Sequence, residues 1–129
     1  MLDTFLEAMA ATPFVDGQSD CALTIADWAM VATGCADPAG HLRGRYHNAL
    51  GRERLLRRLG GLETVIGECA RRAGLSETAN PVRGDVGLVR LNGQDLAAIC
   101  VGRRWAIKSS RGVVVEPVEV LRAWSVPHG

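Results

Sequence analysis

The sequence predicts an α+β fold, with helices in the first part of the chain and an antiparallel sheet in the second. Before Val82, apolar residues recur at helical spacing, whereas the later runs are rich in β-forming residues and alternate with polar ones. A turn at Asn92-Gly93 joins two of these later runs, as in a β-hairpin. The 129 residues, 47% of them hydrophobic, suit a single domain spanning residues 1–129. Helices followed by strands are typical of the α+β class.

Two helices are expected before residue 34. Four apolar residues recur at the spacing of one helix face: Leu2, Phe5, Leu6 and Met9. Pro13 ends this first helix. The second helix, about Asp20 to Thr33, is apolar almost all round, so we expect it to lie at the centre of the fold. Ser19 or Asp20 can cap its N-terminus, and Gly34 ends it.

Two further helices and a set of strands complete the predicted fold. The segments GRERLLRRL and GLETVIGECARRAGL indicate two helices, separated by the glycine pair at positions 60 and 61. We expect the segment SETANP to be a loop. Four β-rich runs follow: VRGDVGLVRL, DLAAICVG, RRWAIKS and VVVEPV. The final run, VEVLRAW, is compatible with a short helix or with a last strand.

The composition excludes several classes of function. The formal net charge of +1 gives no global field that would attract nucleic acid or an anionic membrane. No apolar segment is long enough to cross a bilayer, and the N-terminus MLDTFLEAMAATPF lacks the basic leader of a signal peptide. We therefore expect a protein with no membrane span and no nucleic-acid partner, which is made and kept in the cytoplasm or built into an assembly there.

The cysteines do not indicate a metal site or disulfides. The four are Cys21, Cys35, Cys69 and Cys100. They lie far apart, without a CxxC pair, and a reducing compartment keeps such residues as thiols. Cys35 and His41 could supply two zinc ligands, but no second pair at ligand spacing follows. The prediction is a protein with no metal and no cofactor.

Cys21 is the candidate nucleophile, because it follows Asp20 where the central helix begins. A thiol at a helix N-terminus lies near free backbone N–H groups and the positive end of the helix dipole, and both favour the thiolate. The adjacent Asp20 opposes ionisation if its carboxylate is close, unless it points away and caps the helix. A cysteine peptidase also needs a base, normally histidine, from elsewhere in the fold. An ordinary buried thiol is the alternative interpretation, and the position of Cys21 alone favours it.

Two further carboxyl groups are candidates for a cleft or a structural role. Asp27 lies on about the same helix face as Asp20 and is polar on an otherwise apolar helix. A buried carboxylate needs a partner, and we expect the backbone or an arginine, Arg43 or Arg45, to supply it, although orienting a group in a cleft is also open. Asp85, after a glycine, is expected to serve a turn or to pair with an arginine.

Three short motifs resemble the NlpC/P60 branch of the papain-like fold. Asp20-Cys21 corresponds to the Asp-Cys pair that opens the central helix of that family, and Gly84-Asp85 to the motif that begins its first core strand. The run LAAICVG, residues 96–102, corresponds to the strand His-Val-Gly-Ile-Tyr-Leu-Gly, which carries the catalytic histidine. The resemblance implies a papain-like, NlpC/P60-type single domain, in which the cysteine helix packs on a C-terminal antiparallel sheet.

A closer resemblance covers most of the chain. The pattern FVDGQSDCALTIADW…LRGRY…GGLE…RGDVGLV…CVG…RAWSV is similar to a small family with a domain of unknown function. Its members are encoded in tail gene clusters of bacteriophages and of gene transfer agents. This resemblance implies a virion protein of a phage tail, made in the cytoplasm of the bacterial host.

The catalytic histidine of the NlpC/P60 strand has no counterpart in this chain. Its position falls on Leu96, or on Asp95 with a shift of one residue, and neither can act as an imidazole base. The histidines present do not replace it: His41 and His47 lie in the connector, and His128 is next to the C-terminus. The resemblance therefore implies a vestigial nucleophile, Cys21, without its base.

These observations lead to one expected function and two alternatives. The expected function is a structural or assembly protein at a phage-like tail tip or hub, built on a catalytically inactive NlpC/P60-like fold. Its partners would be other tail or hub proteins, with peptidoglycan as a further candidate. One alternative is an active cysteine peptidase or amidase that cleaves peptidoglycan peptides when the particle enters a cell, using a histidine from a non-standard position. The other is an unrelated soluble α+β binding protein.

Overall fold

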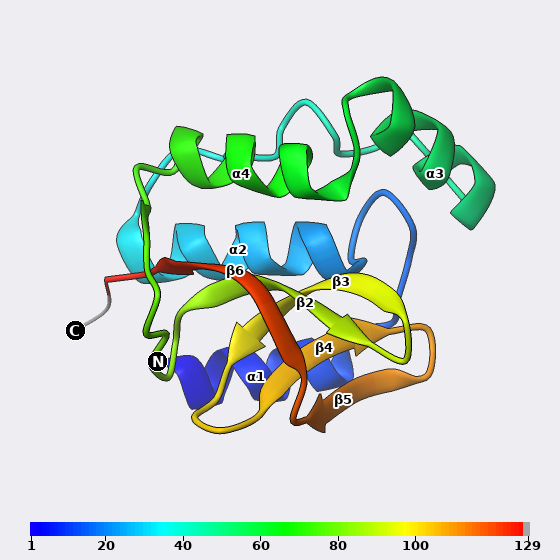
Figure 1. Ribbon diagram of the computed structural model, residues 1–129. Coiled ribbons are helices and arrows are strands. Elements are labelled where there is room, and N and C mark those ends of the chain that lie inside the picture. The colour runs from blue at the N-terminus through cyan, green and yellow to red at the C-terminus, as the bar shows by residue number, and fades with distance from the viewer. Residues whose placement is uncertain (128–129) are drawn as a thin grey trace.

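A computed structural model of the protein describes residues 1–127 and shows, within them, four helices and six strands (Figure 1). The helices are α1 (Leu2–Ala11), α2 (Cys21–Thr33), α3 (Ala49–Arg58) and α4 (Leu62–Arg72). The strands are β1 (Ser76–Glu77), β2 (Val86–Leu91), β3 (Gln94–Cys100), β4 (Trp105–Ser109), β5 (Gly112–Glu116) and β6 (Glu119–Ser125). Helices precede the strands along the chain, which confirms the predicted α+β class.

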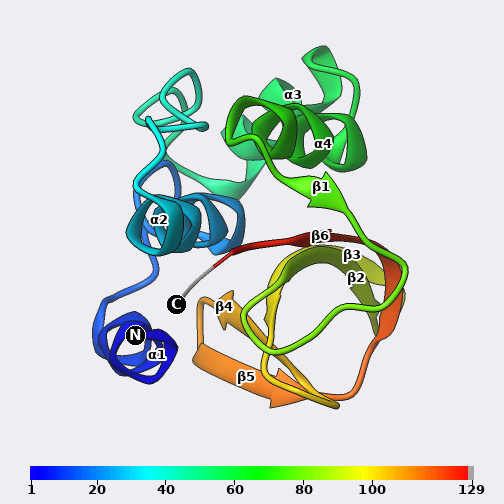
Figure 2. The same cartoon turned by 90° about the vertical axis from the view of Figure 1, so that its left-hand side faces the viewer.

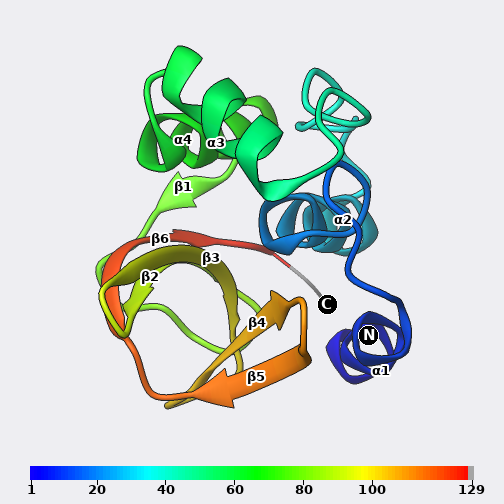
Figure 3. The same ribbon diagram turned by 90° about the vertical axis from the view of Figure 1, so that its right-hand side faces the viewer.

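The six strands form one antiparallel sheet in the order β1-β6-β2-β3-β4-β5. The sheet curls into a partly closed ring (Figures 2 and 3). Its inner face holds a hydrophobic cluster of Val89, Ala98, Cys100, Trp105, Ile107 and Ala123. A Cβ atom at Gly87 would lie 2.8 Å from the Arg122 carbonyl oxygen and 2.9 Å from the Trp105 ring. The tight curl of the sheet therefore depends on a glycine at this position.

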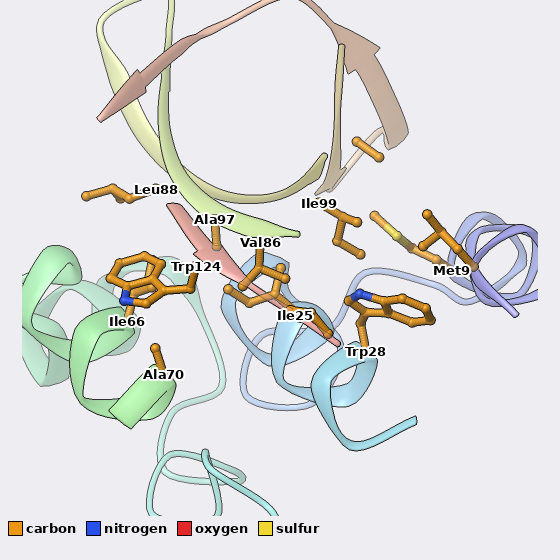
Figure 4. Packing of buried hydrophobic residues seen from close by; sticks show 13 residues of the cluster. Met9, Ile25, Trp28, Ile66, Ala70, Val86, Leu88, Ala97, Ile99 and Trp124 are labelled. Carbon is orange, nitrogen blue, oxygen red and sulfur yellow. The ribbon is translucent and has the colours of Figure 1, made fainter. Parts of the chain in front are cut away.

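Helix α2 lies between α4 and the sheet and buries both of these sides (Figures 1 and 4). Toward the sheet, Ile25 and Trp28 pack against strand residues, which are Val86, Leu88, Ala97, Ile99, Ala106 and Trp124. On its other side, Leu23 and Ala26 pack against residues of the connector and of α4, which are Ala39, Leu42 and Val65. This arrangement confirms that the cysteine-bearing helix is central and packs on the C-terminal sheet.

Most predicted elements form close to their expected places, with one difference in the strands. The pair Asn92-Gly93 forms the β2–β3 turn, with φ values of 53° and 76° that are typical of this hairpin type. Residues 76–77, expected in a loop, form the short edge strand β1 along β6. The segment VEVLRAW, which suited a helix or a strand, is strand β6 and lies between β1 and β2. The unexpected strand β1 arises from pairing with the distant strand β6, which local sequence does not encode.

Candidate cysteine cleft

A cleft of about 930 Å³ opens at the end of the molecule where α2 begins. Figure 3 views this end, at which α3 and the β2–β3 and β4–β5 turns also lie. The cleft is lined by residues from the loop before α2, from α3 and from β3 and β4. They include Phe14, Cys21, Arg52, Leu56, Asp95, Leu96 and Lys108. The cysteine singled out in the sequence therefore lines this cleft.

The start of α2 at Cys21 is fixed by the side chain of Asp20. This side chain is fully buried, and its Oδ1 accepts a hydrogen bond from the Leu23 amide at 3.2 Å, as an N-cap does. Its Oδ2 accepts two more, from the Gly17 amide at 3.0 Å and from Tyr46 Oη at 2.5 Å. Burial, followed by the hydrogen bond to Asp20, raises the pKa of Tyr46 far above its usual value. Asp20 thus ties together the helix, the preceding loop and the connector.

Gly17 permits the close approach of these segments. Its φ is +82°, and a Cβ atom built there would lie only 2.1 Å from the Tyr46 carbonyl oxygen. Any side chain at this position would push the connector away from Asp20. The turn before Cys21 therefore depends on a glycine as much as on the carboxyl group.

The Cys21 thiol is held in its neutral form. Burial raises its pKa above the usual value, and the neighbouring Asp20 adds to this effect. The backbone amide of Ala97 on β3, the Arg52 guanidinium and the Ala22 amide act in the opposite direction without reversing it. The helix N-terminus favours the thiolate, as expected from the sequence, but burial outweighs this effect, as the alternative interpretation of an ordinary buried thiol implies.

The expected histidine position does not place an acid–base group beside the sulfur. Leu96 packs with the inner cluster of the curled sheet, on the side of β3 that holds Ala98 and Cys100. Alternation along a strand therefore turns Ala97, not Leu96, toward α2, and the Ala97 amide interacts with the Cys21 sulfur. Asp95 shares the Ala97 side but forms an ion pair with Arg90 at 2.7 Å.

No histidine of residues 1–127 lines the cleft. His41 lies against α4, where its Nδ1 is 2.9 Å from Arg72 Nη1, and burial and Arg72 lower its pKa. His47 is exposed on the connector. His128 lies outside the described residues. The described part of the site therefore has a nucleophile position without a histidine base.

Asp27 and Asp85 have structural contacts and lie outside the cleft. Asp27 Oδ1 accepts a hydrogen bond from Arg43 Nη2 at 2.7 Å, so its partner is one of the two arginines that the sequence suggested. Burial raises the pKa of Asp27, and Arg43 opposes that shift. Asp85 is buried at the other end of the sheet, where its carboxyl group accepts hydrogen bonds from the Val82 amide at 2.9 Å and the Val126 amide at 3.0 Å. It closes the turn that leads into β2.

Sequence reasoning missed three residues that shape the cleft. Tyr46 bonds Asp20, and Arg52 on α3 forms an ion pair with Asp16 in the loop before α2. Lys108 is 3% exposed, and its ammonium donates to carbonyl groups at the end of α1, those of Met9 and Thr12. Burial lowers the pKa of Lys108. A signal for Lys108 exists, because it is the only lysine of the chain and stands in an apolar strand.

Alkaline pH is expected to destabilise the protein through three thiols whose pKa is raised in the fold. Burial raises the pKa of Cys21 and Cys100 and raises that of Cys69 to about 11, whereas an unfolded thiol titrates near about 8.5. The stabilisation is complete below about pH 8.5 and is lost as pH rises through the folded values, because only the unfolded chain then releases these protons. Urea unfolding at several pH values should show the free energy of unfolding falling between about pH 8.5 and 11.

A variant pair tests this assignment. Cys69→Ala should flatten the alkaline fall, since one of the responsible thiols is gone. Cys35→Ala, which removes a thiol outside the hydrophobic clusters, should keep the wild-type profile. Identical pH profiles for the wild type and Cys69→Ala would contradict the assignment.

The described residues show neither a metal-binding cluster nor a membrane-spanning helix. Across residues 1–127, no three side chains of His, Cys, Asp or Glu come together in a group that could hold a metal ion. None of the helices described for the chain combines the length and the apolar character needed to cross a bilayer.

Comparison with curated proteins found no match, and comparison with solved structures found none either. One family model, described as Domain of unknown function (DUF6950), matches residues 1–126. This match covers nearly the whole chain, and the protein therefore belongs to the DUF6950 family.

Proposed function

We propose that the protein is a structural or assembly component of a phage-like tail, located at the tail tip or hub. In this proposal its fold is of the papain-like, NlpC/P60 type and has lost its hydrolytic chemistry. One observation carries the proposal: the group on β3 that interacts with the Cys21 sulfur is the backbone amide of Ala97. A cysteine hydrolase needs an imidazole at that position. A cleft that keeps its shape without its base is suited to docking.

The arrangement of the three family motifs supports the NlpC/P60-type fold. Cys21 begins a central helix, and this helix packs on β3, which carries the third motif. Asp85, from the second motif, closes the turn before β2. Since β2 and β3 are paired neighbours, motifs far apart in the sequence belong to one core, as that fold requires.

The neutral thiol supports loss of activity. Nucleophilic attack requires a thiolate, and departure of an amine requires a proton from a positioned acid. Burial holds Cys21 protonated, and neither Ala97 nor Leu96 has a group that could accept or return a proton. The strand that faces Cys21 therefore offers no acid–base group at the position where the NlpC/P60 strand carries its histidine.

An active cysteine peptidase or amidase is the second candidate. The cleft of about 930 Å³ favours it, because it is large enough for a peptide and holds a thiol at a helix N-terminus. This function would need a histidine from a partner chain or from beyond residue 127.

Particle composition tests the proposal. Tails purified from a strain that produces the particles should contain this chain by mass spectrometry, together with other tail or hub proteins. Deletion of its gene should reduce the yield of complete particles, and Cys21→Ala should restore that yield as well as the wild-type gene does. Complete particles that lack the chain, made at full yield without the gene, would rule out the proposed role.

A further inference from the structure

The two strands that border the cleft separate from each other within the sheet. Strands β3 and β4 pair only at Ile99 with Ala106 and at Cys100 with Trp105. Strand β4 nevertheless continues to Ser109, paired with β5, and the first half of β3 remains paired with β2. The facing edges of β3 residues 94–98 and β4 residues 107–109 therefore diverge.

This divergence forms part of the cleft. Asp95 and Leu96 line it from β3, and Ile107, Lys108 and Ser109 line it from β4. Within residues 1–127, no strand pairs with either of these two edges. At the inner end of the gap, the Ala97 amide interacts with the Cys21 sulfur, and Ala97, Ile107 and Lys108 are buried. The outer residues, Asp95 and Leu96 on β3 and Ser109 on β4, are partly exposed and line the cleft. Facing strand edges of this kind offer alternating N–H and C=O groups to an extended chain.

We propose that an extended, acidic segment of a second tail protein inserts between β3 and β4. The segment pairs its backbone with the two free edges and places its acidic side chains against α3. This inference rests on the proposed function, because that function supplies the partner protein. It adds where on the molecule the partner binds and which chemistry is recognised.

The charge of the cleft selects an acidic segment. The lining contains four cationic side chains, Arg52, Arg57, Arg90 and Lys108, and two carboxyl groups, Glu53 and Asp95. Three of the four cations are already engaged: Arg90 with Asp95 at 2.7 Å, Arg52 with Asp16, and Lys108 with the Met9 and Thr12 carbonyl groups. The closest contact between Arg57 and Glu53 is 3.9 Å, and the Arg57 side chain is 85% exposed, so this guanidinium is free to bind another carboxylate.

Helix α3 extends this positive charge beyond the cleft. Arg54 lies three residues before Arg57 on the helix, and Arg58 directly follows Arg57. Neither Arg54 nor Arg58 has an ion-pair partner among the residues that the structure describes. Unpaired strand edges match the repeating donors and acceptors of a peptide backbone, which nucleic acid lacks. The edges and the charge together therefore favour an acidic polypeptide over a nucleic acid.

Selection from a phage-displayed library of random peptides on the immobilised protein tests this inference. We expect enrichment of peptides rich in Asp and Glu, and a selected peptide should bind the protein in a fluorescence anisotropy titration. Arg57→Glu should weaken that binding by about tenfold or more, because it sets a like charge against the peptide. Amide NMR shifts on binding should concentrate in residues 94–97 and 107–110.

The matched control is Arg103→Glu. It makes the same change of charge at an exposed arginine in the β3–β4 connection, outside the cleft. Its peptide affinity should stay within about twofold of the wild type. The absence of enrichment, enrichment of basic peptides, equal effects of the two variants, or displacement by a single-stranded DNA oligonucleotide would each overturn the inference.

The inference and the proposed function fail separately. If the particles contain the chain but the purified protein selects no acidic peptide, only the inference is wrong. If the protein binds acidic peptides but complete particles lack the chain, the proposed role in the tail is wrong and the binding site is still supported.

Discussion

Replacing Trp28 with alanine is expected to lower the free energy of unfolding by about 3–5 kcal/mol, the range for removing a large aromatic side chain from a core. Trp28, on α2, is fully buried and packs against α1 and the sheet (Figure 4). Its ring centroid is 5.4 Å from that of Phe5, and its Nε1–H donates to the Gly84 carbonyl oxygen at 2.8 Å. The substitution leaves a cavity and removes the donor that links α2 to the segment before β2.

Urea unfolding of Trp28→Phe provides the comparison for that result. Phenylalanine cannot donate to the Gly84 carbonyl oxygen, so Trp28→Phe should lose some stability. Because it keeps an aromatic ring in the core, it should lose less than Trp28→Ala. A loss below about 1 kcal/mol for Trp28→Ala would be typical of a surface substitution and would contradict the central position of α2.

Replacing Asp20 with alanine is expected to cost about 2–4 kcal/mol, because it removes both a helix cap and the acceptor of other buried donors. The amides of Gly17 and Leu23 and the hydroxyl of Tyr46 all lose their partner. The measurement is urea unfolding of the variant. Tyr46→Phe, which removes one donor, should cost less, and a double-mutant cycle of the two should show clear coupling.

Asn48→Ala is the matched control for the cap. Asn48 caps α3 through its Oδ1, which accepts from the Gly51 amide at 2.8 Å, but it is exposed. Water can satisfy that amide after the substitution, so the loss should be about 0.5–1 kcal/mol. Equal losses for Asp20→Ala and Asn48→Ala would show that Asp20 acts only as an ordinary cap.

The sequence was sufficient for features that depend on local chemistry. The all-round apolar character of residues 20–33 identified the central helix α2, the polar pair Ser19 and Asp20 narrowed its N-cap to two residues, of which Asp20 is the cap, and Asn92-Gly93 identified the β2–β3 turn. Each of these signals lies within a few neighbouring residues. The partner of Asp27 could also be narrowed to Arg43 or Arg45, because a carboxyl group on an apolar helix requires a cation nearby.

Features that depend on distant segments could not be predicted in this way. Tyr46 reaches Asp20 across 26 residues, and no periodicity in the connector marks it. The motif alignment placed the histidine position on Leu96, but strand alternation turns Ala97 toward Cys21. A shift of one residue along a strand moves a side chain to the opposite face of the sheet, so a motif match alone does not fix which residue faces the site.

The separation of β3 from β4 also leaves no trace in the sequence. Both strands keep β-rich patterns to their ends. They nevertheless pair only next to their connection, at Ile99 with Ala106 and at Cys100 with Trp105. Pairing is decided by what else packs at the gap, here the first turn of α2 with the Cys21 thiol against Ala97. The cleft is therefore a product of tertiary packing rather than of any single motif.

Hydrolysis of peptidoglycan stem peptides tests the central claim most directly. Purified wild-type protein and Cys21→Ala are incubated with purified muropeptides, and the products are quantified by mass spectrometry. We predict no cleavage above the buffer control for either protein, because acid–base assistance worth about 10² to 10⁴ in rate is missing beside the sulfur. Cleavage by the wild type that Cys21→Ala abolishes would contradict the account and establish the protein as a cysteine hydrolase.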